Sequence, residues 1–148
     1  WQCGARFLKE NTTWLSEFGK KSPDLARSVK CLGFIDRMDL AYAAADIIAS
    51  RAGAMSISEL ALVAKPTLLI PSPHVSEDHQ RKNALSLVKR GASILVEDDE
   101  VVDKLRVEIE SLLLNKKACD DMVSALKAAS RPNASIIIVD EVEKLLDL

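Results

Sequence analysis

The sequence predicts an α/β fold in which helices flank a parallel sheet. Short apolar runs alternate along the chain with helix-forming segments, as in the run at 67–70 and the segment at 78–89 that follows it. The runs are continuously apolar, which is typical of parallel strands covered on both faces. Strands that alternate with helices form right-handed β-α-β units. With 148 residues, the chain fits one domain with a substantial core.

The composition argues against several classes of protein. The chain is 48% hydrophobic and 28% charged, as an ordinary globular protein is. Its net charge of −2 comes from mixed charges without a basic block, so we expect no nucleic-acid partner. No run of about 18 apolar residues is present, and we therefore expect no transmembrane segment. The three cysteines are odd in number and widely spaced, which argues against a disulfide framework or a zinc site.

The chain begins as if inside a longer protein. Residues 1–4 read as the end of a strand, with Gly4 beginning a turn, and they carry no initiator methionine or signal peptide. We therefore expect the chain to be a fragment. The predicted elements that follow are a helix over 5–18 weakened at 11–13 and ended by Gly19, a strand over 28–35 and a helix over 38–45.

The stretch 50–59 is the most informative part of the sequence. An apolar strand over 46–50 leads into a turn of small residues, in which Gly53 is free to adopt a positive φ. Ser56 and Glu59 form an S-x-x-E capping box, which predicts that the next helix begins near Ser56. A small-residue turn before an exposed helix N-terminus is a natural place to hold an anion. The same local pattern also occurs at strand-to-helix joints that bind nothing.

The remaining elements continue the alternation and end in helices. We expect a strand over 67–70, a loop from 71, a helix over 78–89 with Ala84, Leu85 and Val88 inward, a strand over 92–96, and helices over 98–114, 116–129 and 134–148. The expected core face of the helix over 98–114 consists of Val101, Val102, Leu105, Val107, Ile109, Leu112 and Leu113. Ligands of parallel sheets bind beyond the carboxyl ends of the strands. The strand-end turns at 34–36, 50–56 and 71–80 therefore predict one composite site.

Several separated blocks occur in a specific order. They are Phe34-Ile35-Asp36-Arg37-Met38, Ala41 to Asp46, Ser50 to Glu59, Lys65-Pro66, Ile70-Pro71, Glu77-Asp78-His79-Gln80 and Asn83-Ala84. Together they resemble the C-terminal half of the MurG family, over essentially the whole chain. These bacterial transferases add N-acetylglucosamine from UDP-GlcNAc to the undecaprenyl-linked muramyl-pentapeptide in peptidoglycan synthesis.

The resemblance implies a GT-B architecture, which is two Rossmann-like domains facing a cleft. Residues 1–148 would form the C-terminal domain, which binds the UDP-sugar. The family's first strand and glycine-rich loop would precede Trp1, and the N-terminal acceptor domain would lie outside the chain.

The resemblance also implies a substrate-binding set. Its members are Phe34, Ile35, Arg51, Ala54, Met55, Ser56, Ile57, Ser58, Glu59, His79, Gln80 and Asn83. The backbone of Ile35 would contact uracil, and the N–H groups at 54–56 would face the diphosphate or sugar at the positive end of a helix. Glu59 would accept from both ribose hydroxyls, and the amides of Gln80 and Asn83 would contact the sugar.

Four of these residues also have a purely structural interpretation. Phe34 fits a core aromatic, Glu59 the second half of its capping box, and Arg51 a surface salt bridge. His79 fits a solvated loop histidine, and we do not expect it to act as a base.

The implied chemistry is an inverting displacement, in which the acceptor hydroxyl attacks the anomeric carbon of GlcNAc while UDP leaves. We expect this domain to position the UDP-sugar and to stabilise charge on the leaving group, with no catalytic residue, metal site or cofactor of its own. The expected partners are UDP-GlcNAc and, through the missing N-terminal domain, the lipid-linked acceptor. We expect the full-length protein to be cytoplasmic and peripheral on the inner face of the plasma membrane.

Alternatives remain open on the sequence alone. Another UDP-sugar enzyme of the GT-B fold, such as a UDP-GlcNAc 2-epimerase or a glycolipid glycosyltransferase, would share this domain. A nucleotide-sugar-binding subunit without activity of its own is a second alternative. A plain α/β regulatory domain is a third, but it would not need the three turns to converge.

Overall fold

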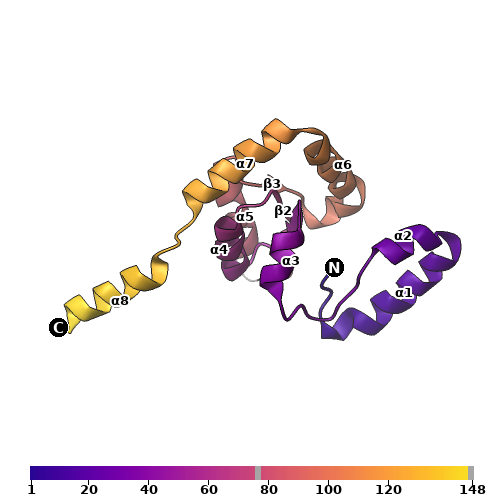
Figure 1. The fold of residues 1–148 in the computed structure, drawn as a ribbon, viewed down its shortest axis with the longest axis horizontal. Coiled ribbons are helices and arrows are strands. Elements are labelled where there is room, and N and C mark those ends of the chain that lie inside the picture. Colours follow the sequence, from indigo (N-terminus) through magenta and orange to yellow (C-terminus); the bar gives the residue numbers. More distant parts are fainter. Residues whose placement is uncertain (76–77, 147–148) are drawn as a thin grey trace. The chain divides into compact units, whose positions relative to one another are not determined.

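The computed structural model describes residues 1–75 and 78–146. The chain divides into two compact units, Trp1–Ala43 and Ala44–Leu148. Figure 1 colours the chain from the indigo N-terminus to the yellow C-terminal helix. The first unit is largely helical, and the second carries a parallel sheet.

The first unit is built from short helical segments. They are η1 (Ala5–Phe7), α1 (Leu8–Lys21), α2 (Pro23–Ser28) and α3 (Met38–Ala44), whose last residue opens the second unit. The first predicted helix is confirmed, but α1 continues through Gly19 without a break at 11–13. The two threonine hydroxyls at 12–13 each donate to a carbonyl one turn earlier at 2.8 Å, so these polar side chains are satisfied within the helix.

The sequence predictions for residues 23–35 are only partly right. Residues 23–27, for which no element is predicted, form α2 together with residue 28, because Pro23 occupies the first helical position, where its missing N–H has no cost. The strand predicted over 28–35 is wrong in extent, since it is reduced to one parallel bridge between Gln2 and Leu32. Leu32 accepts from Cys3 N at 2.9 Å and donates to Trp1 O at 2.8 Å, so the first residues do pair as a strand end does.

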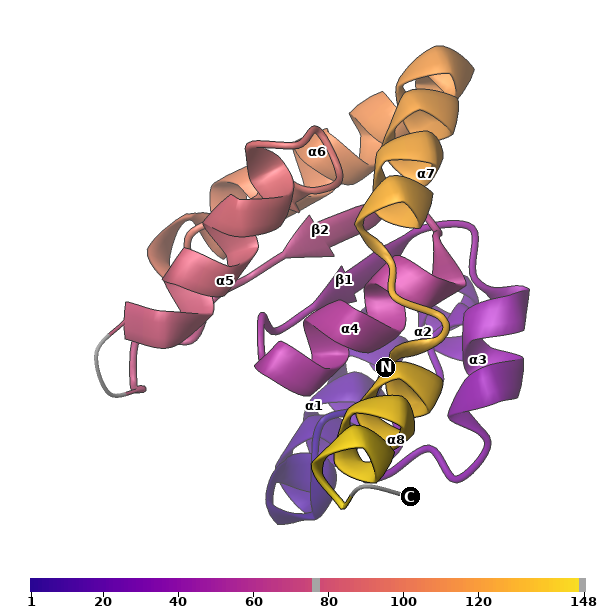
Figure 2. The ribbon, with the colours of Figure 1, turned by 90° about the vertical axis from the view of Figure 1, so that its left-hand side faces the viewer.

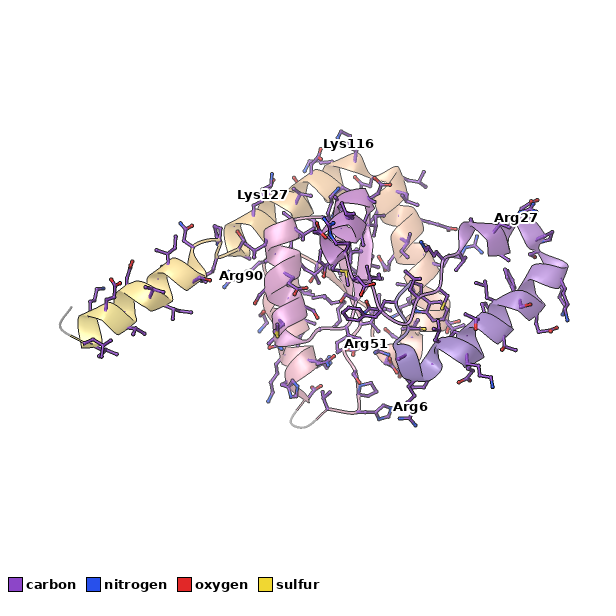
Figure 3. All side chains as sticks on the ribbon, turned by 60° about the horizontal axis from the view of Figure 1, so that its bottom comes forward. Arg6, Arg27, Arg51, Arg90, Lys116 and Lys127 are labelled. Carbon is purple, nitrogen blue, oxygen red and sulfur yellow. The ribbon has the colours of Figure 1, made fainter. Side chains whose placement is uncertain are left out.

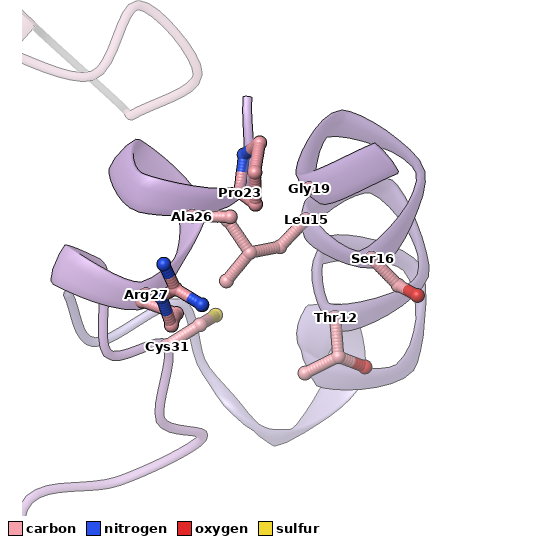
Figure 4. Close-up of a pocket in the computed structure, with 8 residues that line it drawn as sticks. All are labelled: Thr12, Leu15, Ser16, Gly19, Pro23, Ala26, Arg27 and Cys31. Atoms are coloured by element: carbon pink, nitrogen blue, oxygen red, sulfur yellow. The ribbon is translucent and has the colours of Figure 1, made fainter. Parts of the chain in front are cut away.

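A cavity of about 420 Å³ lies between α1 and α2 (Figure 4). Leu15, Ala26 and Cys31 are among the side chains that line it. Cys31 Sγ lies 3.6 Å from Cys3 Sγ, and both thiols are free. Desolvation and the hydrogen bond with Cys3 raise the pKa of Cys31 above its ordinary value, so this thiol is protonated at neutral pH. The described residues that line the cavity include none of the predicted site residues.

The second unit contains a three-stranded parallel sheet in the order β1–β2–β3. The strands are β1 (Ile48–Ser50), β2 (Thr67–Leu69) and β3 (Ile94–Leu95). All three predicted strands of this region are therefore confirmed, each in a shorter form. Every residue of β2 is buried, whereas β1 at the edge is half-buried and its Ala49 is exposed. The parallel α/β fold class predicted from the apolar runs is confirmed.

Helices cover the sheet on both sides. The helical elements of the second unit are α4 (Ala54–Val63), α5 (His79–Val88), η3 (Asp98–Glu100), α6 (Val101–Leu114), α7 (Lys116–Ala129) and α8 (Ala134–Leu145), of which α8 has no buried residue. The crossovers β1–α4–β2 and β2–α5–β3 advance in one direction along the sheet, so α4 and α5 lie on the same face and contact each other. Figures 1 and 2 show α6 on the opposite side of the strands.

The core of this unit joins α4, β2 and α7. Leu60 on α4, Leu68 on β2 and Leu126 on α7 are fully buried, and α4 contacts α7. Met122 on α7 also reaches the sheet, since its Sδ accepts from Thr67 N at 3.2 Å. The bounds predicted for α7 are confirmed, and Asn115 caps it by accepting from Ala118 N at 3.0 Å.

The inward faces of α5 and α6 differ from the prediction. On α6, Val102, Val107 and Leu113 are exposed, by 90% in the case of Val102, and Leu112 is the buried residue. The predicted face is too wide because neighbours such as 101 and 102 diverge by about 100° around a helix. On α5 the buried residues are Ala84 and Leu87, and the predicted Leu85 and Val88 are half-buried.

The last helix, α8, carries no buried residue. Residues 136–139, an Ile-Ile-Ile-Val run, are helical as predicted and are exposed by 51–63%. The end of the predicted helix at 147–148 lies outside the described residues. Within the described part of the chain, no helix has the length and apolar character that a bilayer crossing requires.

Candidate functional site

Two of the three predicted strand-end turns lie side by side. β1 and β2 are parallel neighbours, so the chain leaves both at the same edge of the sheet. Ile70 N donates to Ser50 O at 2.8 Å, which joins the start of one turn to the start of the other. The turns at 50–56 and 71–80 therefore converge as predicted, apart from residues 76–77, which lie outside the described part of the chain. The third turn, at 34–36, belongs to the first unit.

The helix after β1 begins earlier than the capping box predicts. α4 starts at Ala54 with Gly53 as its N-cap, and no side chain caps it. Its first backbone bond runs from Ile57 N to Gly53 O at 2.9 Å, which places Ser56 in the first turn. The predicted helix start at Ser56 is therefore wrong, because the backbone of Gly53 already closes the turn. Gly53 does not use its freedom to adopt a positive φ, since its φ is −64°.

Because no side chain caps α4, its N-terminus presents backbone N–H groups that could bind a ligand. The N–H groups of Ala54, Met55 and Ser56 precede the helix's own hydrogen-bond ladder. Ala54 and Met55 are exposed, Met55 by 79%, and Ser56 and Ile57 are half-buried. The positive end of the helix dipole and a row of N–H groups thus face outward, which is an arrangement that suits an anion.

The side chains of Ser58 and Glu59 lie in the same helix. Ser58 Oγ donates to Ala54 O at 3.1 Å, so this hydroxyl is bonded within α4. Glu59 is exposed, one turn beyond the helix start. With Ser56 no longer the N-cap, the capping-box interpretation of Glu59 loses its geometry.

Arg51, labelled in Figure 3, contacts residues that follow the other two strands. Its Nη1 donates to Ile70 O at 3.3 Å and to Pro71 O at 3.2 Å, and it forms an ion pair with Asp98. The salt-bridge interpretation of Arg51 is therefore confirmed. The guanidinium is half-exposed, with 55% of the side chain accessible.

The three predicted residues of α5 are placed differently from one another. Gln80 and Asn83 are half-buried, and both reach the strand-end turns. Gln80 Oε1 accepts from Ser72 N at 2.9 Å, and Asn83 Nδ2 donates to Ala52 O at 3.3 Å. His79, the first residue of α5, is exposed.

A cavity of about 310 Å³ opens next to these turns, beyond β2 and β3. It is lined by Pro71, Ser72, Pro73, Asp78, Arg81, Glu97, Asp98 and Asp99. Arg81 Nε donates to Glu97 Oε1 at 2.8 Å, and this bond holds the pKa of Arg81 above its ordinary range. The cavity is bordered by loops at the carboxyl ends of two strands, as ligand sites in this fold class are.

In the first unit, the backbone edge predicted to contact uracil is already bonded. Ile35 N donates to Gln2 Oε1 at 2.9 Å. Phe34 is 69% exposed, so the interpretation of Phe34 as a core aromatic is wrong for the described structure. A flat ligand that used Ile35 N would have to replace the Gln2 carbonyl.

Sequence reasoning missed three residues that organise these turns, which are Gln2, Ser72 and Asp98. Asp98 follows β3 in the same way that Arg51 follows β1, so the strand-end rule could have selected it. Gln2 and Ser72 act through contacts that a linear pattern does not reveal. Among residues 1–75 and 78–146, no three His, Cys, Asp or Glu side chains are arranged to hold a metal ion.

Comparisons with known proteins agree on one family. The family described as "Glycosyltransferase family 28 C-terminal domain" matches residues 1–136. A relative from Flavobacterium psychrophilum, named UDP-N-acetylglucosamine--N-acetylmuramyl-(pentapeptide) pyrophosphoryl-undecaprenol N-acetylglucosamine transferase, is 44% identical over 99% of this chain and 38% of its own length. Relatives of the same name from Christiangramia forsetii and Porphyromonas gingivalis are 42% and 40% identical, each over 99% of this chain and 37% of their own length.

A solved structure shows the same fold. The crystal structure of Acinetobacter baumannii MurG matches 97% of this chain and 40% of that chain, with a TM-score of 0.76 and 26% identity. The chain spans about two fifths of the length of the relatives it matches. On the evidence of its sequence and fold, this chain belongs to the glycosyltransferase family 28 C-terminal domain family.

Proposed function

We propose that the chain is the UDP-sugar-binding domain of an inverting glycosyltransferase that moves GlcNAc from UDP-GlcNAc to the lipid-linked muramyl-pentapeptide. The observation that carries the proposal is the identity of 40–44% with relatives of that name, over nearly the whole chain. The adjacent strand-end turns, with an uncapped helix start between them, support it. The lipid in the relatives' name supports a place at the cytoplasmic membrane surface for the full-length protein.

The proposed binding mode assigns one part of UDP-GlcNAc to each turn. The N–H groups at 54–56 face the diphosphate, since these groups precede the helix ladder. Glu59 accepts from the ribose hydroxyls, and the adjoining Ile57 and Ser58 border the same part of the ligand. Gln80 and His79 face the sugar, for which the Nε2 of Gln80 is a suitable hydrogen-bond donor. Ile35 and Phe34 receive the uracil, with Gln2 giving way to the base.

In the reaction this domain acts by position and charge. The UDP leaving group gains negative charge as the acceptor hydroxyl attacks the anomeric carbon. Oriented N–H groups at the start of α4 stabilise that charge in the transition state. The acceptor and the group that removes its proton belong to the part of the enzyme beyond this domain.

Calorimetric titration of the full-length protein tests the proposal directly. UDP is expected to bind more tightly than CDP or ADP, and UDP-GlcNAc more tightly than UDP-glucose. A protein that binds none of these nucleotides would contradict the proposal. Retention of configuration at the anomeric carbon of the transferred GlcNAc would contradict the inverting mechanism, but not the binding of UDP-GlcNAc.

Gly53 offers a test of close approach by the phosphates. Its φ of −64° suits any residue, and an added Cβ would meet Ser56 Oγ at an ordinary 3.6 Å. Replacing Gly53 by alanine is therefore expected to change the free energy of unfolding by less than about 1 kcal/mol. UDP affinity is expected to fall by about ten-fold, because the new methyl group keeps the phosphates from the backbone. Equal UDP affinity in the two proteins would show that no ligand approaches this position.

We also propose that residues 1–148 lack the first strand of the domain, together with its glycine-rich loop and the N-terminal acceptor domain. β1 is an edge strand of the described sheet, and this supports a further strand beside it, since edges are normally covered. Ile48 N donates to Pro66 O, toward β2, so the alternation of a strand directs Ala49 N–H to the outer edge.

Hydrogen exchange on the two lengths of protein tests this arrangement. The Ala49 amide is expected to exchange at least about ten times more slowly in the full-length protein than in residues 1–148. The Ile48 amide, already bonded to β2, serves as the internal control. Equal exchange rates of the Ala49 amide in the full-length protein and in residues 1–148 would show that no further strand pairs with this edge of β1.

A further inference from the structure

We propose that Arg51, Asp98 and Asn83 are positioning residues, which hold the turn after β1 in the shape that receives the diphosphate. The inference rests on the proposed function of that turn. It differs from direct contact with the UDP-sugar, which the family resemblance implies for Asn83, and it separates two roles open to Arg51, which are orienting the turn and offsetting phosphate charge. The distinction matters because each role predicts an opposite effect of removing Asp98.

The guanidinium of Arg51 connects the ends of all three strands. Arg51 itself follows β1, its two carbonyl partners at 70–71 follow β2, and its carboxylate partner Asp98 follows β3. All three contacts are made by Nη1, which directs that end of the fork toward the protein. A guanidinium can hold several acceptors at fixed angles, which a lysine ammonium cannot do in the same way.

Asn83 holds the next residue of the turn from a different element. Its Nδ2 donates to the carbonyl of Ala52, a residue with no exposed surface. A buried carbonyl without a partner is costly, so this bond favours one orientation of the peptide between Ala52 and Gly53. That peptide directly precedes the first N–H groups of α4. Two adjacent residues of the turn are thus held from different elements. Arg51 is held by Asp98, which follows β3, and Ala52 is held by Asn83 on α5.

The ion pair is too exposed to serve mainly the stability of the fold. The side chains of Arg51 and Asp98 are 55% and 35% accessible, and pairs of this kind contribute little to unfolding. A shift of the turn would instead move the N–H groups at 54–56 relative to the phosphates. The expected signature is a loss of affinity for the diphosphate with little change for the nucleoside.

The decisive variant is Asp98→Ala in the full-length protein, measured by calorimetry with UDP and with uridine. A positioning role predicts that UDP affinity falls by about ten-fold while uridine affinity changes by less than two-fold. If Arg51 bound phosphate directly, loss of the competing carboxylate would leave UDP affinity equal or make it higher. That result would overturn the inference.

Two further variants separate position from charge and from general damage. Arg51→Lys keeps the charge and is expected to lose about as much UDP affinity as Arg51→Ala, whereas a purely electrostatic role predicts affinity near the original. Asn83→Ala is expected to show the same selective loss for UDP over uridine. An Arg51→Lys variant with unchanged UDP affinity would also overturn the inference.

The control is an exposed ion pair away from the turns, Arg106 with Glu110 on α6, whose bond is 2.7 Å long. Glu110→Ala is expected to leave UDP and uridine affinity unchanged. The unaltered protein separates the two hypotheses, because failure to bind UDP at all contradicts the proposed function. UDP binding that is insensitive to Asp98 contradicts only the positioning role.

Discussion

Replacing Glu59 by alanine is expected to weaken UDP binding by about ten-fold or more while the fold stays intact. Hydrogen bonds to a charged group are worth about 1.5–3 kcal/mol, and the carboxylate would accept from both ribose hydroxyls. Glu59 is exposed on α4, so its removal disturbs no core packing. Titration of the full-length protein with UDP measures the loss.

The ribose role has a sharper signature in 2′-deoxy-UDP. The unaltered protein is expected to prefer UDP over the deoxy analogue, and Glu59→Ala is expected to lose that preference. Glu143→Ala, which removes an exposed carboxylate on α8, is the matched control and should leave both affinities unchanged. Discrimination that survives in Glu59→Ala would assign the ribose contact to another residue.

Replacing Leu126 by alanine is expected to lower the free energy of unfolding by about 2–5 kcal/mol. Leu126 is fully buried on α7, which packs on α4, so its truncation leaves a cavity in the core of the second unit. Urea denaturation followed by circular dichroism measures the change. The loss is large compared with the stability of a typical domain, so partial unfolding at 37 °C is expected.

Leu114→Ala makes the same chemical change on a side chain that is 89% exposed. Its effect on the free energy of unfolding is expected to stay within about 0.5 kcal/mol. Equal losses in the two variants would mean that α7 does not close the core.

The sequence predicted correctly those helices and strands whose residue pattern alone determines them. The predicted bounds of α7 agree with the structure, in which Asn115 caps the helix and the chain breaks from the helical pattern at 131–133. The Ile-Ile-Ile-Val run of α8 was predicted to be helical because charged residues with helical spacing follow it. The strands of the second unit were found because they are short, apolar runs between helices.

The errors arose where a neighbour in space decides the outcome. The strand over 28–35 is reduced to one bridge because pairing depends on the residues beside it, which a linear pattern does not reveal. The start of α4 moved to Ala54 because Gly53 accepts the first helical bond ahead of the predicted cap. The buried face of α6 is narrower than predicted because only one stripe of a helix can contact the sheet.

For the candidate site, the sequence predicted which turns form it but not which side chains hold those turns. The rule that ligands bind beyond strand ends selected the turns after β1 and β2, and the structure brings those two together. The rule did not reveal that Arg51, Gln80 and Asn83 would each hold backbone groups of those turns. A side chain's partner depends on distances across the fold, which spacing along the chain does not encode.

The exposed C-terminal helix has a practical consequence for the behaviour of the isolated chain. Among residues 1–75 and 78–146, every buried residue lies at or before Leu126, so α8 adds apolar surface without adding to the core. Contact between such surfaces from different molecules removes them from water and is favourable. Solubility at high concentration will therefore depend on α8, and shortening the chain after Ser130 should raise it without loss of stability.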